Sequence, residues 1–138
     1  MERRWLVPSP PPGWTPESPH RVLEDRYLEG TRLRLRKSTC SASGDVVYKL
    51  GQKLPCGPAT HRKLTNLYLS QGEHRLLANL PARALCKRRY RIGELVLDVL
   101  ESGLMLAEAE FASEEEMADF VPPVWVGEEV SLMPEWPL

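Results

Sequence analysis

The sequence has few cysteines, no long apolar run and almost no net charge. Its 138 residues include three cysteines, Cys40, Cys56 and Cys86, which are too far apart for a zinc motif or an even disulfide framework. The apolar stretch near the N-terminus ends at Pro8, too soon for a signal region, and no later run could span a membrane. The formal net charge of −1 argues against a surface that coats nucleic acid or anionic lipid. These absences predict a single cytoplasmic domain over residues 1–138.

What the sequence does have is a regular alternation of charged and apolar side chains. One run reads TRLRLRK, in which Leu33 and Leu35 alternate with Arg32, Arg34 and Arg36. A period of two places the two sets on opposite faces of a β-strand. Taken alone, the same pattern also fits an ordinary half-buried strand with one solvated face.

The remainder of the chain predicts short strands joined by turns, with two short helices. Strands are expected at 3–7, 21–28, 31–37, 46–50, 64–69, 87–92, 94–100 and 104–111, with a glycine- and proline-rich excursion at 51–59. Two pairs with capping-box spacing, Ser70 with Glu73 and Ser113 with Glu116, predict helices that end near Pro81 and Phe120. We therefore expect an α+β, mainly antiparallel fold: a closed, tunnel-like barrel of about eight strands with two or more short helices.

Cations and carboxylates gather on different predicted strands. Lys87, Arg89 and Arg91 alternate along one strand, whereas Glu108 and Glu110 share one face of another. If both faces pointed into a closed barrel, rows of cations would face rows of carboxylates. Such a tunnel suits a phosphate chain gripped by guanidinium groups together with a hard divalent cation held by carboxylates. The alternative is that the two glutamates are exposed edge-strand charges that limit aggregation.

Eight short motifs occur in a characteristic order along the chain. They are ERRWLV at 2–7, YL at 27–28, RLR at 34–36, YK at 48–49, KRRY at 87–90, LDV at 97–99, GLMLAEAEF at 103–111 and PPVWVGEEV at 122–130. In this order they resemble the CYTH family of triphosphate tunnel metalloenzymes, and the GLMLAEAEF stretch is the most specific of them. The resemblance implies an eight-stranded antiparallel tunnel that binds triphosphate through basic side chains and one or two Mg²⁺ or Mn²⁺ ions through glutamates.

The resemblance also implies a role for individual residues. Glu2, Glu108 and Glu110 would be the metal ligands and the catalytic residues, with Asp98 as a support or further ligand. The phosphate-binding residues would be Arg4, Arg34, Arg36, Lys49, Arg89 and Arg91, with Arg32 as a weaker candidate. The implied partner is a triphosphate-containing small molecule or inorganic polyphosphate, and the implied activity is metal-dependent hydrolysis of inorganic or small organic triphosphates.

The sequence departs from the family pattern in its carboxylates. The family opens with Glu-x-Glu-x-Lys, whereas Met1 occupies the middle position here, so the first glutamate is missing, and Arg4 replaces the lysine. The segment 65–68 lacks the usual glutamates and arginine, and 133–138 lacks the usual basic tail. Fewer carboxylates predict weaker affinity for a second ion, and arginine does not deprotonate to act as a base.

Two other functions therefore remain open. The first is a non-catalytic polyphosphate- or nucleotide-binding module that has lost part of the metal site. The second is a protein-interaction domain that uses the proline-rich loop at 8–13 and the tryptophan-rich C-terminal tail. Adenylate cyclase activity has little support, because the sequence shows no evident adenine pocket.

Overall fold

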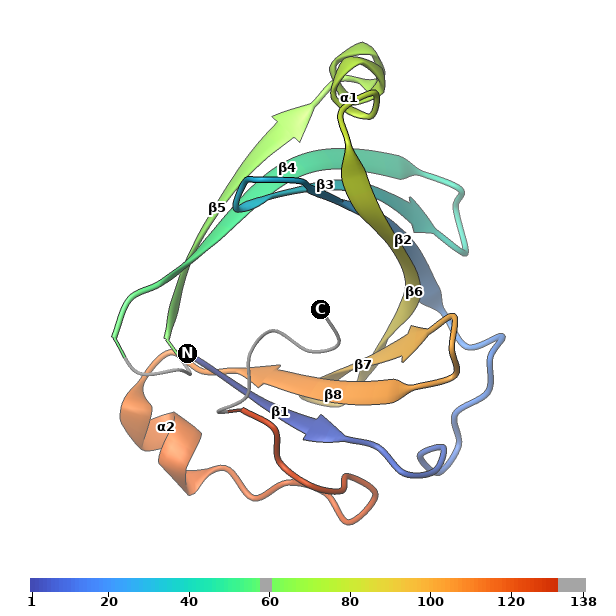
Figure 1. The fold of residues 1–138 in the computed structure, drawn as a ribbon. Helices are drawn as coiled ribbons and strands as arrows, with labels where there is room; N and C mark the ends of the chain where they lie inside the picture. Colours follow the sequence, from blue (N-terminus) through green and yellow to red (C-terminus); the bar gives the residue numbers. More distant parts are fainter. Residues whose placement is uncertain (58–60, 132–138) are drawn as a thin grey trace.

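Eight antiparallel strands form one sheet that curls into a half-barrel, and two short helices accompany it (Figure 1). The structure is a computed structural model that describes residues 1–57 and 61–131. The elements are β1 (Glu2–Leu6), β2 (His20–Leu28), β3 (Leu33–Cys40), β4 (Val46–Pro55), β5 (Arg62–Leu69), α1 (Gln71–Leu77), β6 (Ala82–Ile92), β7 (Leu95–Leu100), β8 (Met105–Glu110) and α2 (Glu114–Asp119). The strand order in the sheet is β1-β8-β7-β6-β2-β3-β4-β5.

The sheet is open, so the prediction of a closed barrel is wrong. Within the described residues no ladder joins β1 to β5, the two outermost strands. The outer side of β1 is bonded to the chain that follows α2: the Leu6 N–H donates to the Glu128 carbonyl at 2.8 Å, and the Val130 N–H donates to the Arg4 carbonyl at 2.8 Å. These bonds use the backbone N–H and C=O groups of β1 that point away from β8. The free edge of β1 is therefore not available for pairing with β5.

Strand β4 is longer than the sequence predicts. It continues through Gly51 to Pro55, so the first half of the predicted excursion at 51–59 is a strand. Gly51 pairs with Arg34 of β3 on one side and with Asn66 of β5 on the other. Backbone pairing on both sides holds the glycine in the strand, against its low intrinsic preference.

Both predicted helices are present, and the first has the predicted cap. The Ser70 hydroxyl accepts from the Glu73 N–H at 3.1 Å, and the Glu73 carboxylate accepts from the Ser70 N–H at 2.8 Å. At α2 the box is half formed, because the Glu116 carboxylate accepts from the Ala112 N–H instead. Among the described helices, none is long and apolar enough to cross a membrane.

The main apolar core lies on the outer face of β1, β6, β7 and β8. Its buried members are Trp5, Val7, Tyr90, Leu95, Leu97, Ala107 and Ala109. The connection between β1 and β2 covers it through Trp14, whose ring meets Tyr90 edge-on with centroids 5.3 Å apart. The chain around α2 covers it through Phe120, which lies 5.8 Å from the Trp5 ring. Since side chains alternate along each strand, burying this face turns the intervening charged residues to the concave face.

We expect Leu97→Ala to lower the free energy of unfolding by about 2–5 kcal/mol, because Leu97 has no exposed surface and its removal leaves a cavity in the core. Urea unfolding followed by circular dichroism measures the change. Leu76→Ala on α1 is the control, since Leu76 is 74% exposed and should change stability by no more than about 0.5 kcal/mol. Equal losses in the two variants would contradict this assignment of the core.

Candidate functional site

The strand register brings a continuous band of charged side chains onto the concave face. Residues directly opposite each other on paired strands share a face. The paired positions that carry charge are Glu2 with Glu110, Arg4 with Glu108, Arg89 with Asp98, Asp25 with Arg36, and Arg36 with Lys49. The band therefore crosses the sheet from β1 to β4.

A cavity of about 300 Å³ opens along this band, and we call it the central cavity. Its charged lining consists of six basic side chains, Arg34, Arg36, Lys49, Lys53, Arg62 and Arg89, and three carboxylates, Glu2, Glu108 and Glu110. Met1, Leu64 and Asn66 complete the lining. Among the described residues the cations outnumber the carboxylates two to one, so the cavity is suited to an anion.

Arg89 is fixed by a bidentate ion pair with Asp98. Its Nε and Nη2 donate to the two Asp98 oxygens at 2.8 Å each, and Lys87 Nζ lies 3.1 Å from Asp98 Oδ2. Burial by itself would raise the pKa of Asp98, but the hydrogen bonds from Arg89 and the charge of Lys87 lower this pKa to about 2. Asp98 is therefore a carboxylate held by two cations, and it orients Arg89 toward the central cavity.

Arg36 is fixed in the same way by a residue on the neighbouring strand. Its Nε and Nη2 donate to the two Asp25 oxygens at 2.7 and 2.8 Å. The Asp25 side chain has no exposed surface and the Arg36 side chain is 8% exposed, so the pair is almost wholly buried. Removing either partner would leave an uncompensated charge in the interior.

Among the described residues, Arg34 and Lys49 have no such carboxylate anchor. Arg34 Nε is buried and has no hydrogen-bond partner among the described residues. Burial lowers the pKa of Arg34, and the neighbouring Arg36 lowers it further. Burial also lowers the pKa of Lys49, with added repulsion from Arg36 and Arg34. These two side chains have the most to gain from a bound anion.

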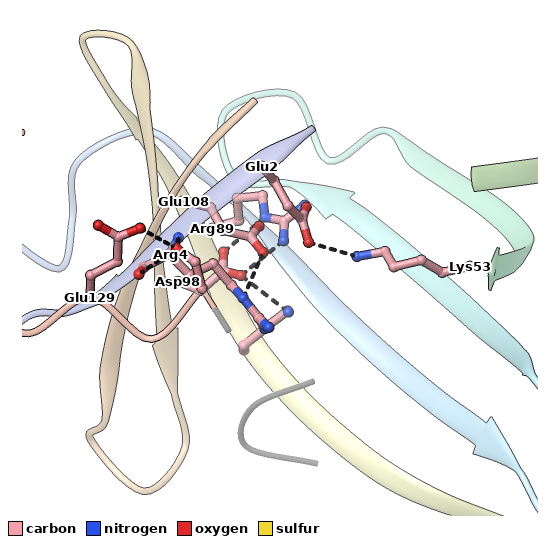
Figure 2. A network of polar contacts seen from close by, with 9 residues as sticks. Glu2, Arg4, Lys53, Arg89, Asp98, Glu108 and Glu129 are labelled. Carbon is pink, nitrogen blue, oxygen red and sulfur yellow. Dashed lines mark hydrogen bonds and ion pairs between the residues drawn. The ribbon is translucent and has the colours of Figure 1, made fainter. Parts of the chain in front are cut away.

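The three cavity carboxylates lie on the paired strands β1 and β8. Figure 2 shows Glu2 facing Lys53 of β4, with Glu2 Oε1 3.8 Å from Lys53 Nζ. Glu108 Oε1 lies 3.8 Å from Arg4 Nε, and burial followed by the charge of Glu2 raises the pKa of Glu108. Both separations exceed hydrogen-bond length, so neither of these two ion pairs includes a direct hydrogen bond to the carboxylate.

This donor set has the chemistry of a magnesium or manganese site but is not assembled as one. Hard divalent cations prefer carboxylate oxygens, and the pKa of Glu108 is raised by burial and then by the charge of Glu2, both of which a bound cation would offset. Across the described residues, no three carboxylate, imidazole or thiol side chains are grouped closely enough to hold a metal ion. Metal binding would therefore require these side chains to move together.

The structure brings most of the predicted site residues into one place. Seven of them line the central cavity: Glu2, Glu108, Glu110, Arg34, Arg36, Lys49 and Arg89. Arg4 and Asp98 line a narrower cavity of about 40 Å³ that shares Arg34, Arg36 and Arg89 with it. Arg91 is exposed and is not among the residues that line the central cavity; it lines a neighbouring cavity with Glu110 and with acidic residues of α2. Arg32 lies in the turn before β3.

Sequence reasoning missed three polar side chains of the central cavity, Lys53, Arg62 and Asn66, as well as Met1 and Leu64. Lys53 was missed because residues 51–59 were predicted to be a loop and not part of a strand. Lys49, Gly51 and Lys53 nevertheless keep the period of two that marks one face of a strand. Arg62 and Asn66 stand in the same period within β5. Asp25, the partner of Arg36, is flanked by Glu24 and Arg26, and the alternation does not single it out.

Solved structures with this fold span almost the whole chain. The crystal structure of the inorganic triphosphatase NE1496 matches with a TM-score of 0.60 and 23% identity, covering 99% of this chain and 89% of that chain. Another crystal structure, described as the hypothetical protein NE1496, matches with a TM-score of 0.59 and 25% identity, covering 99% and 92%. The PH1819 protein from Pyrococcus horikoshii OT3 matches with a TM-score of 0.53 and 14% identity, covering 86% and 82%.

These similarities support a CYTH-like fold for this chain. No protein-family model matches the sequence, and no curated protein matches it either. At such low identity the likeness concerns the fold alone.

We expect Asp98→Asn to destabilise the protein in a pH-dependent way. The pKa of Asp98 falls from 3.8 to about 2 on folding, so its charge contributes about 2 kcal/mol to stability above about pH 4. That contribution is lost as the pH falls toward 2, because the native carboxylate is then protonated. Urea unfolding at several pH values should therefore show a gap between wild type and variant that narrows from pH 4 to pH 2.

Asp45→Asn is the matched control, because Asp45 is exposed in the turn between β3 and β4. Its unfolding profile should follow that of the wild type. A gap for Asp98→Asn that stays constant across this pH range would contradict the assignment.

Proposed function

We propose that this chain is a CYTH-type triphosphatase that binds triphosphate in the central cavity and hydrolyses it with Mg²⁺ or Mn²⁺. The observation that carries the proposal is the unbalanced charge of the cavity, which has six basic side chains against three carboxylates. The buried Nε of Arg34, without a partner among the described residues, adds a donor that a phosphate oxygen would satisfy.

Some of the basic residues would position the phosphate chain, and others would neutralise its charge. Arg36 and Arg89 each use Nε and Nη2 for a carboxylate, which leaves Nη1 to donate to a phosphate oxygen from a fixed position. Arg34 and Lys49 would supply the charge that the phosphate chain neutralises. Phosphoryl transfer depends mainly on positioning and electrostatic stabilisation, so this arrangement requires no covalent intermediate.

Glu2, Glu108 and Glu110 would hold the divalent cation. A bound ion of this kind neutralises phosphate charge and lowers the pKa of coordinated water. Glu108 is the central member of the set, because it is two residues from Glu110 on β8, and because burial and then the charge of Glu2 raise its pKa.

The similarity to NE1496 supports the choice of ligand. That protein is described as an inorganic triphosphatase, and this chain shares its fold along 99% of its length. A triphosphate is therefore the first ligand to test, in its inorganic form or as part of a small organic molecule.

A non-catalytic polyphosphate-binding module is the second candidate. It is favoured by the cations that approach two of the carboxylates, Lys53 beside Glu2 and Arg4 beside Glu108, and by the lack of an assembled metal site among the described residues. Phosphate-release assays with tripolyphosphate, a nucleoside triphosphate and thiamine triphosphate, each with Mg²⁺ or Mn²⁺, separate the candidates. Binding without release for every compound would establish the module and rule out the enzyme.

We expect Arg34→Gln to raise the Kd for tripolyphosphate by about 10- to 100-fold, since it removes a charged donor without breaking an anchoring ion pair. Titration calorimetry without metal measures this. Arg88→Gln is the control, because Arg88 is exposed on the outer face of β6. An unchanged Kd for Arg34→Gln would remove Arg34 from the site.

We expect Glu108→Gln to lower the metal-dependent kcat by about 100-fold, because it removes a proposed metal ligand. Metal-free tripolyphosphate binding should not weaken, since the lost charge repels the phosphate chain. Glu101→Gln, at an exposed turn, is the control and should keep wild-type kcat. Weaker metal-free binding in Glu108→Gln would indicate that Glu108 organises the cavity instead of holding metal.

A further inference from the structure

A second cavity adjoins the central cavity beside β3, and we call it the side cavity. It has a volume of about 210 Å³ and lies between the turn before β3 and the strands β4 and β5. It shares Arg34, Lys53 and Leu64 with the central cavity. A ligand held on Arg34 can therefore extend from one cavity into the other.

The wall of the side cavity is chemically different from that of the central cavity. Tyr27, Leu33 and Leu64 supply an aromatic ring and two branched apolar side chains, and no carboxylate belongs to its described lining. Pockets that enclose a whole small ligand measure roughly 300–1,000 Å³, so the side cavity is of a size for one ring-shaped group of a larger ligand. Apolar and aromatic walls of this kind suit a flat, neutral ring.

Gly51 sets the boundary between the two cavities. A Cβ atom at this position would lie 2.9 Å from Asn66 Oδ1 and 3.1 Å from Arg34 Nη2. The missing side chain therefore lets the Arg34 guanidinium lie against β4, where it borders both cavities. Arg34 can contact the phosphate that carries an organic group while that group occupies the side cavity.

The charges around the side cavity select among ring groups. Arg32, Arg34 and Lys53 all contribute to its lining. A cationic ring such as a thiazolium would be repelled by these three groups, whereas a neutral heterocycle would not be.

We infer that the side cavity binds the neutral ring of an organic triphosphate, such as the base of a nucleoside triphosphate. The inference rests on the proposed function, since the triphosphate would occupy the central cavity. The sequence does not reveal this pocket because Tyr27, Leu33 and Leu64 come from three strands and their faces meet only after folding.

Titration calorimetry without metal tests the inference on the full chain. The ligands are a nucleoside triphosphate and methyl triphosphate, which carries the same charged chain without a ring. We expect the wild type to bind the nucleoside triphosphate at least about tenfold more tightly. Thiamine triphosphate has a cationic ring, so its affinity should exceed that of methyl triphosphate by a smaller factor than the affinity of the nucleoside triphosphate does.

The variant Leu33→Gln should reduce the preference for the nucleoside triphosphate by about fivefold and leave the Kd for methyl triphosphate unchanged, because Leu33 lines the side cavity and is not among the residues that line the central cavity. Leu67→Gln is the control, since Leu67 is 58% exposed on the face of β5 opposite Leu64 and is not among the residues that line either cavity. It should leave both affinities unchanged.

Three results would overturn the inference. Equal wild-type affinity for the two ligands would mean that the side cavity binds no ring, while the central site stands. Equal weakening of both ligands by Leu33→Gln would place the effect in the central cavity. Failure of the wild type to bind either ligand would refute the proposed function itself, together with the inference that rests on it.

Discussion

The structure depends on keeping strong charges paired on the concave face of a single curled sheet. Arg36 with Asp25 and Arg89 with Asp98 are bidentate pairs between neighbouring strands, and each buries a carboxylate. Removing such charges from water costs several kcal/mol per ion, so the pairs are tolerated only because their geometry is good. The main apolar core can therefore lie on the outer face of β1, β6, β7 and β8, while a smaller cluster of Leu100, Leu106 and Val130 packs beside the charged residues.

The same pairing divides the arginines into two kinds. Arg36 and Arg89 are held by carboxylates, and their positions do not depend on a ligand. Arg34 lies among other cations, with its Nε unpartnered in the described part of the chain. Two guanidinium groups in fixed positions and a third with an unsatisfied Nε make a preorganised anion site. Most of the donors are already oriented when the protein folds, so little free energy is lost in orienting them when an anion binds. Arg34 also borders the side cavity, so the ring and the phosphate chain would meet at this residue.

Alternation along the strands was enough to predict most of the sheet and to place Arg34, Arg36, Arg89, Glu108 and Glu110 on charged faces, because a period of two fixes the face of each side chain. Glu2 and Lys49 were added to the predicted site by the resemblance to the CYTH family. Alternation could not predict closure, since whether β1 meets β5 depends on what else bonds to β1, and the chain after α2 takes that edge. It also could not identify Asp25 as the partner of Arg36, because register between strands is a tertiary property. In the tail at 124–138, Trp125 packs against the apolar core, and residues 132–138 lie outside the described residues.

The open side of the half-barrel bears on the choice between binding and turnover. Lys53 of β4 lies 3.8 Å from Glu2 of β1 across this side, so the same carboxylate faces a cation of the protein and would also serve as a metal ligand. The separation is longer than a hydrogen bond, which makes the pair weak and replaceable. A triphosphate that draws Lys53 toward its own oxygens would leave Glu2 free for a divalent ion. Anion binding and metal binding would then be coupled through the position of Lys53.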